Sequence, residues 1–103
     1  MKHEIRNELD KAVLVLSDQL VDADRAAFER VVMQVVGSGA RMIEVDFKDL
    51  TYMDSAGLGL LLTLREQAEK ARAKVILANP KGSVREILEL ARFDTLFSIQ
   101  HAP

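Results

Sequence analysis

The sequence has no cysteine or tryptophan, and only two prolines and one tyrosine among its 103 residues. Without cysteine, the chain can form no disulfide and offers no thiolate to a substrate or a metal ion, which fits a reducing compartment. Long apolar runs are also missing, because the block Leu58 to Leu62 is far shorter than the roughly 20 residues of a membrane-spanning helix. We therefore expect a globular protein of the cytoplasm.

Neither sign of charge dominates the chain. It has 14 Lys and Arg and 16 Asp and Glu, so its net charge is −2 at pH 7. A nucleic acid or an anionic membrane would require a basic surface, so neither is expected as a partner. The length and the 49% hydrophobic content are those of one domain, and the first ten residues lack the apolar core of a signal peptide. We expect a monomer with a single domain over residues 1–103.

Apolar periodicity divides the chain into strands and helices. Apolar residues at helical spacing predict a helix from Asp22 or Asp24, ended by glycines 37 and 39. The other expected helices are Ser55–Arg72 and Ser83–Arg92. The expected strands are 3–9, 11–18, 41–47 and 74–80, and residues 95–100 form either an edge strand or a docked tail. The leucines that open the second helix leave it almost no polar side, so most of them are expected to be buried.

The order of these elements predicts an α/β fold. Strands that alternate with helices are joined by right-handed crossovers and form a largely parallel sheet. The first strand meets the second through a turn at Asn7–Lys11, so it lies differently paired at an edge. We expect a mixed, mostly parallel sheet of four to five strands with three to four helices.

The stretch LTYMDSAGLGLLL, residues 50–62, places an acid, a hydroxyl and two glycines at the start of the leucine-rich helix. It follows a strand and precedes a helix, where sites form in open α/β sheets. The simplest interpretation is a helix cap, with Ser55 accepting a hydrogen bond from the backbone of Gly57 or Leu58 and Asp54 near the positive helix end. A cap does not explain Gly57 and Gly59, because each glycine costs about 1 kcal/mol relative to alanine in a helix. Close approach of another surface would explain them.

Catalytic interpretations of this stretch lack the residues they need. A nucleophilic serine requires Gly-x-Ser-x-Gly, but Met53 stands at the first glycine position, and His3 and His101 lie near the chain ends. A phospho-accepting aspartate, Asp54 or Asp46, would require an acidic pair after the first strand to hold magnesium, and that pair is missing. No cluster has the spacing of metal ligands. We therefore expect no metal, no cofactor and no enzymatic activity.

A further interpretation makes Ser55 a regulated hydroxyl. A phosphate there would carry about −1.5 to −2 charges and would face the N–H groups of the helix N-terminus, which stabilises the modified domain. Beside Asp54 it would also form a dense negative spot. A partner that packs on Gly57, Leu58 and Gly59 would then be repelled, so the domain would stay stable while its interface is switched.

The segment VDFKDLTYMDSAGLGLLL, residues 45–62, resembles the signature of STAS domains, specifically of bacterial anti-sigma factor antagonists. The resemblance extends over nearly the whole chain, including KVILANP and VREILELARFDTLFSI. It implies that Ser55 is phosphorylated by a serine kinase that also serves as an anti-sigma factor. The unphosphorylated antagonist would bind this kinase and free the sigma factor for transcription. Phosphorylation would end the binding, and a serine phosphatase would restore it.

This chain departs from the family pattern in two places. The family often has Gly-x-Leu-Asp at the end of the second strand, where this chain has Asp18-Gln19-Leu20-Val21, with the acid Asp22 one position later. That difference affects the surface a partner would meet. The position after the phosphoacceptor is often a second serine, and here Ala56 removes this rival acceptor.

The expected partner surface combines the motif with its neighbours. Its residues are Asp22, Tyr52, Met53, Asp54, Ser55, Gly57, Leu58 and Gly59. Asp54 is expected to cap the helix and to help shape the contact with the kinase. Tyr52 and Met53 are expected to be exposed contacts unless they pack in the core. The alternative within the family is a constitutive STAS subunit that binds the ATPase of a lipid-transporting ABC system. In that case Ser55 would serve only as a helix cap.

Overall fold

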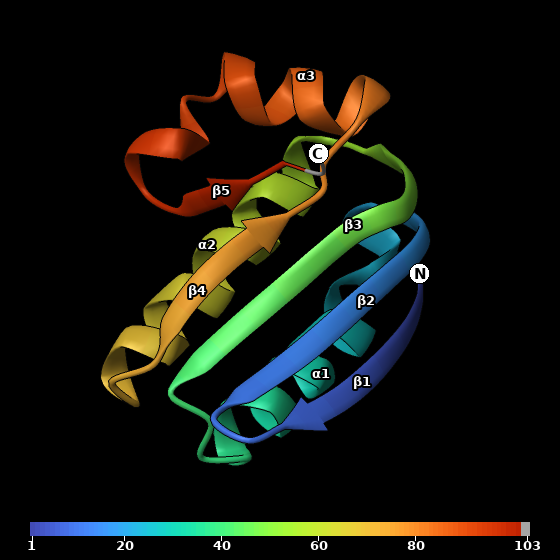
Figure 1. Cartoon of the computed structure of the whole chain (residues 1–103). Coiled ribbons are helices and arrows are strands. Elements are labelled where there is room, and N and C mark those ends of the chain that lie inside the picture. Colours follow the sequence, from blue (N-terminus) through green and yellow to red (C-terminus); the bar gives the residue numbers. More distant parts are fainter. Residues whose placement is uncertain (102–103) are drawn as a thin grey trace.

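The computed structural model describes residues 1–101 and shows a five-stranded sheet with helices packed against it (Figure 1). In chain order the elements are β1 (Lys2–Glu8), β2 (Lys11–Leu20), the 3-10 turn η1 (Asp22–Asp24), α1 (Arg25–Gly37), β3 (Met42–Met53), α2 (Ser55–Lys70), β4 (Lys74–Ala78), α3 (Gly82–Leu90), the 3-10 turn η2 (Phe93–Thr95) and β5 (Ser98–Gln100). The predicted alternation of strands and helices is confirmed, and the last segment is an edge strand.

The strands lie in the sheet in the same order as in the chain. β1 and β2 form an antiparallel hairpin, which closes through the two-residue turn Leu9–Asp10 between the paired Glu8 and Lys11. The other three pairs are parallel. A mixed, mostly parallel sheet with β1 at an edge is therefore confirmed. All the parallel strands finish at the same end of the sheet, where the loops that lead into α1, α2 and α3 lie (Figure 1).

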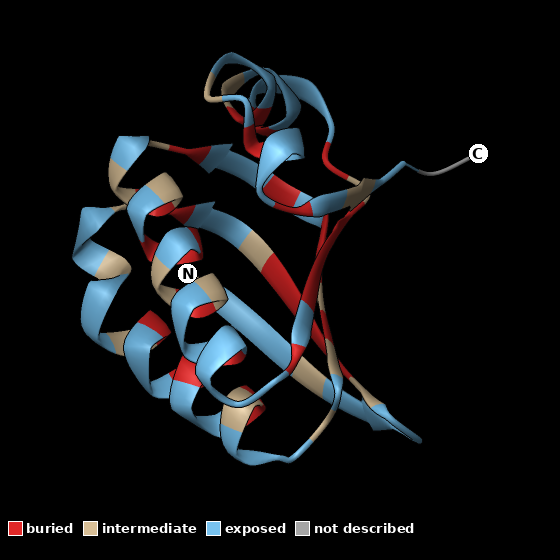
Figure 2. Ribbon diagram, turned by 90° about the vertical axis from the view of Figure 1, so that its left-hand side faces the viewer, coloured by how far each residue is buried: buried red, intermediate tan, exposed pale blue. Residues whose placement is uncertain are grey.

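The main core lies between the sheet and the helices. α1 and α2 cover one face of the sheet, and α3 lies across the end at which the parallel strands finish (Figures 1 and 2). Successive side chains of a strand point to opposite faces, and the core members from β2 and β3 are Ala12, Leu14, Leu16, Leu20, Ile43, Val45, Phe47, Leu50 and Met53. The first and third helices, α1 and α3, contribute Phe28, Val31, Val32, Val35, Val84 and Leu88. The apolar stripes of the first and third helices therefore face the core, as predicted.

β3 is longer than the sequence indicates. The predicted strand ends at Phe47, whereas β3 continues to Met53. The cause is continued pairing with β2, from Ser17 opposite Asp49 to Leu20 opposite Met53. The register shifts once before Ser17 and once between Asp18 and Gln19. Such β-bulges break the regular alternation of buried and exposed residues, so the extension has no clear signal in the sequence.

α2 corrects one expectation about the leucine block. Leu60, Leu61 and Leu64 are buried, but Leu62 is 40% exposed. A helix packed against one surface buries only one stripe of its circumference, and Leu62 lies on the solvent side of that stripe. Leu62 is therefore not a core residue. None of the helices within residues 1–101 has the length and apolar character needed to cross a membrane.

Candidate functional site

Asp54, rather than Ser55, caps α2. The backbone of Asp54 is extended, and its Oδ1 accepts a hydrogen bond from the backbone N–H of Gly57 at 3.0 Å. The N–H of Asp54 donates to the carbonyl oxygen of Leu20 at 3.4 Å, which ties the start of α2 to the end of β2. The interpretation in which Ser55 is the N-cap is wrong, because the carboxylate one residue earlier fills that role, and the expectation that Asp54 caps the helix is confirmed.

Ser55 is the first residue of α2 and is exposed. Within residues 1–101, the side-chain hydrogen bonds around the motif involve Asp18, Thr51, Asp54 and Gly59, and none involves the Ser55 hydroxyl. The first N–H groups of a helix have no partner inside the helix and carry a partial positive charge. The Ser55 hydroxyl is therefore free for chemistry at a place that favours an anion.

The two glycines of the motif have different surroundings. Gly57 is buried, and a Cβ there would overlap the Met53 side chain and lie 2.7 Å from the carbonyl oxygen of Leu20. The strands β2 and β3 thus approach the first turn of α2, and the predicted close approach at Gly57 is internal rather than to a partner. Gly59 is exposed, and a Cβ there would have no atom within 4 Å. Nothing within residues 1–101 requires a glycine at position 59.

Tyr52 and Met53 point to different environments. Tyr52 is 50% exposed, as expected for a contact residue, whereas Met53 is 3% exposed. Met53 is the last residue of β3 and packs below Gly57 in the core. The prediction that Met53 is exposed is wrong, because the lengthened β3 turns its side chain inward.

The loop between β2 and α1 lies next to the start of α2. Asp22 is exposed and forms an ion pair with Arg25 at 3.2 Å. Asp24 accepts hydrogen bonds from the backbone N–H of Val21 and from the Met1 ammonium, both at 2.9 Å. Partial burial acts to raise the pKa of the Asp24 carboxyl, but these two hydrogen bonds and the positive charge of the ammonium outweigh it and lower the pKa. The Asp24 carboxylate therefore holds this loop in place.

The start of α3 borders the same end of the sheet. The Ser83 hydroxyl donates to the carbonyl oxygen of Thr51 at 3.2 Å. The two residues are 32 positions apart in the chain, and no sequence spacing connects them. Sequence reasoning therefore missed α3 as a neighbour of the motif.

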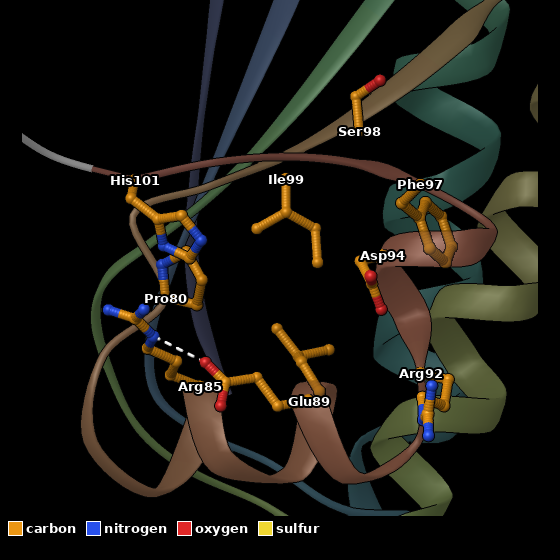
Figure 3. Close-up of a pocket in the computed structure, with 10 residues that line it drawn as sticks. Pro80, Arg85, Glu89, Arg92, Asp94, Phe97, Ser98, Ile99 and His101 are labelled. Atoms are coloured by element: carbon orange, nitrogen blue, oxygen red, sulfur yellow. Dashed lines mark hydrogen bonds and ion pairs between the residues drawn. The ribbon is translucent and has the colours of Figure 1, made fainter.

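A cavity of about 720 Å³ lies between α3 and β5, with none of its lining residues in the range 52–59 (Figure 3). Its lining combines the apolar side chains of Leu88 and Ile99 with charges of both signs. Two of these charges neutralise each other, because Arg85 Nε donates to Glu89 Oε1 at 2.7 Å. No group of three or more His, Cys, Asp or Glu side chains in the described part of the chain is arranged to hold a metal ion. Because its lining includes no residue of the range 52–59, the cavity is separate from the Ser55 surface.

A family model for the STAS domain matches residues 3–102. The chain belongs to the STAS domain family. A STAS-domain-containing protein of Pseudomonas aeruginosa is 41% identical to it over 75 residues, which are 73% of this chain and 69% of the relative. BtrV of Bordetella bronchiseptica, named as a proposed anti-sigma factor antagonist, is 30% identical over 67 residues, 65% of this chain and 58% of BtrV. This STAS domain thus covers less than two thirds of BtrV.

The solved structures of the anti-sigma factor antagonist SpoIIAA share the fold of this STAS domain. The unphosphorylated form has a TM-score of 0.73 at 21% sequence identity, over 99% of this chain and 90% of SpoIIAA. The phosphorylated form, described as a Bacillus cell fate determinant, has a TM-score of 0.72 over 95% of this chain and 90% of SpoIIAA. At this identity the likeness shows the fold alone.

Proposed function

We propose that this STAS domain is an anti-sigma factor antagonist that acts by partner switching. In its unphosphorylated form it binds an anti-sigma factor that is also a serine kinase. Phosphorylation of Ser55 by that kinase releases it, and a serine phosphatase restores the binding form. The names of BtrV and SpoIIAA support the general role, and the existence of a phosphorylated SpoIIAA supports the switch.

The division of roles between Asp54 and Ser55 carries the proposal. Because Asp54 caps α2, the Ser55 hydroxyl is not needed for that task and stays exposed. A hydroxyl with no internal bond costs the fold little when it is modified or removed. The domain can therefore change the charge at position 55 without losing stability, which is what a switch requires.

The surroundings of Ser55 determine whether a phosphate there strengthens or weakens partner binding. A phosphate at the first residue of α2 would lie at the positive end of the helix dipole, which favours it. It would also stand next to the Asp54 carboxylate, where the negative charges concentrate. A partner that covers this end of α2 would have to desolvate that charge, so docking is opposed while the fold is preserved.

The contact surface would surround Ser55 on the outward side of α2. Gly59 lies one turn further along and is open to solvent, so a partner backbone can approach the helix closely there. Tyr52 and the partly buried Leu58 offer apolar area beside it, and Asp22 lies on the neighbouring loop. In this scheme the kinase supplies the nucleotide, the metal and the base, and the STAS domain contributes no catalytic step.

The test uses purified anti-sigma factor kinases encoded in the same genome as this chain. Each is incubated with ATP, Mg²⁺ and the domain, and mass spectrometry locates the phosphate, with Ser83 and Ser98 as internal controls. Calorimetry then compares the unmodified domain, its phosphoform and the Ser55→Ala and Ser55→Asp variants. We expect modification at Ser55 alone and an affinity loss of at least about tenfold, or 1.4 kcal/mol, on phosphorylation.

The variants should separate folding from binding. Ser55→Ala should bind the kinase whether or not ATP is present, and Ser55→Asp should bind poorly with a near-normal melting temperature. Modification at another serine, or unchanged binding by the Ser55 phosphoform, would overturn the switch. Unchanged binding by Ser55→Asp to an ABC-system ATPase would instead favour the constitutive subunit.

A further inference from the structure

Four residues other than glycine have a positive φ within residues 1–101. They are Asp18, Arg72, Asn79 and Arg92, with φ of 73°, 59°, 58° and 57°. The left-handed region is unfavourable for residues that carry a Cβ, so each of them requires a cause. Two are explained by helix ends, since Arg72 and Arg92 directly follow the C-cap residues of α2 and α3, where a left-handed residue commonly ends a helix.

Asn79 is explained by its hydrogen bonds. Its Nδ2 donates to Oδ1 of the buried Asp46 at 3.2 Å. Its backbone N–H donates to the carbonyl oxygen of Gln100 at 2.7 Å. Both contacts hold the end of β4 in place, so the fold itself determines the conformation of Asn79.

Asp18 has no such internal explanation. It lies within β2 beside two register shifts and is exposed. The backbone carbonyl oxygen of Asp18 accepts a hydrogen bond from Thr51 Oγ1 at 2.7 Å. Aspartate tolerates the left-handed region when its side chain bonds locally, but within residues 1–101 the Asp18 carboxylate has no hydrogen bond or ion pair. A glycine would adopt the same backbone without strain.

Asp18 also lies at the end of the sheet that carries Ser55. Two residues later, the carbonyl oxygen of Leu20 accepts the N–H of Asp54, and the neighbouring Gln19 pairs with the exposed Tyr52. The acids of the adjacent loops are already engaged. Asp54 binds the N–H of Gly57, Asp24 that of Val21, and Asp22 pairs with Arg25. The Asp18 carboxylate is therefore free to meet a group outside the domain.

We propose that Asp18 is a specificity-determining residue of the partner surface, and that its carboxylate pairs with a lysine or arginine side chain of the anti-sigma factor kinase. The inference rests on the proposed function. A charge pair at the margin of an interface mainly speeds association and sets its dependence on salt. A kinase without a cation at this point would gain nothing from the Asp18 carboxylate, so Asp18 distinguishes between kinases by the charge that they present there.

The experiment uses the kinase that phosphorylates Ser55. Stopped flow measures the association rates at 50 mM and 500 mM NaCl, where the Debye length is about 14 Å and about 4 Å. Asp18→Asn keeps the size of the side chain and its tolerance of a positive φ while it removes the charge. Asp18→Gly also removes the strain. Asp10→Asn is the matched control, because it removes one negative charge at the hairpin turn, at the opposite end of the sheet.

Asp18→Asn should associate about threefold more slowly than the wild type at low salt, and its rate should depend less on salt. Asp18→Gly should show the same change together with a higher melting temperature, and Asp10→Asn should associate like the wild type. Association of Asp18→Asn at the wild-type rate at both salt concentrations, or a lower melting temperature of Asp18→Gly, would overturn the inference on Asp18 alone. Failure of the wild type to bind any such kinase would overturn the proposed function as well.

Discussion

The inward and outward sides of α2 use the same residue types for different purposes. Gly57 and Leu61 face inward, where the strands leave no room for a side chain at Gly57 and cover Leu61 completely. Gly59 and Leu62 face outward, where a Cβ on Gly59 would meet nothing and Leu62 is 40% exposed. The inward residues are explained by the fold, and the outward ones are not. A motif that reads as one unit in the sequence thus divides into a structural half and a half available to a partner.

Truncating Leu61 and Leu62 should give the largest difference in stability between the inward and outward sides of α2. Leu61→Ala should lower the free energy of unfolding by about 2–5 kcal/mol, because it leaves a cavity in the core. Leu62→Ala should change it by less than about 1 kcal/mol, because the side chain is already partly in solvent. Urea denaturation followed by circular dichroism measures both values. Equal losses would mean that the two leucines share one environment, and the comparison would fail.

The two glycines should respond with opposite signs. Gly57→Ala should destabilise the domain by about 1–3 kcal/mol, because the methyl group overlaps Met53 and approaches the Leu20 carbonyl. Gly59→Ala should stabilise it by up to about 1 kcal/mol, because alanine is the better helix former and finds open space. Thermal and urea unfolding of both variants give the comparison. A Gly57→Ala protein as stable as the wild type would show that the strands can move away from α2.

Adding a larger side chain on the outward side should affect binding rather than folding. Gly59→Val should weaken binding to the kinase that phosphorylates Ser55 by about tenfold, or 1.4 kcal/mol, because the side chain would stand between helix and partner. Its melting temperature should stay near that of the wild type. Calorimetric titration measures the affinity, and Ser83→Ala serves as the reference variant. If Gly59→Val binds as well as Ser83→Ala, the partner does not approach α2 at this point.

The smallest expected effect concerns the loop that supports the inward side of α2 next to Leu20. Because the pKa of Asp24 is lowered in the folded chain from its ordinary value of 3.8, the ionised carboxylate stabilises the fold above about pH 4. That contribution is lost as the pH falls through the folded-state pKa. Asp24→Asn should therefore melt at a lower temperature at pH 7, and the difference from wild type should shrink as the pH falls below 3.8. A difference that does not depend on pH would contradict this assignment.

The elements of the fold can be predicted from the sequence because apolar periodicity reports directly which residues face a core. The stripe from Phe28 to Val35 and the hairpin before Lys11 are local signals, and both are confirmed. The end of β3 is not a local signal. It depends on bulged pairing with β2, which only the assembled sheet defines, and this pairing is also what buries Met53 and Gly57.

The position of the candidate site can be predicted, but its internal arrangement cannot. Asp54 and Ser55 follow a strand and precede a helix, which places them at the end of the sheet. Aspartate and serine are almost equally good N-caps, so the sequence does not decide between them. The extended backbone of Asp54 decides it in the structure. The strained backbone of Asp18 has no signal in the sequence, since its positive φ arises at the bulge in β2.

The strand order β1-β2-β3-β4-β5 has a consequence for the growing polypeptide. Each strand pairs with the strand that left the ribosome just before it, so no pairing has to wait for a segment that is still to be translated. Segments close together in sequence also lose less loop entropy when they meet. At about 5–20 residues per second, we expect the hairpin to form first and each later strand to join a single growing edge. A nascent chain of this kind would keep β1 at one edge of the sheet throughout and would add every later strand at the other edge.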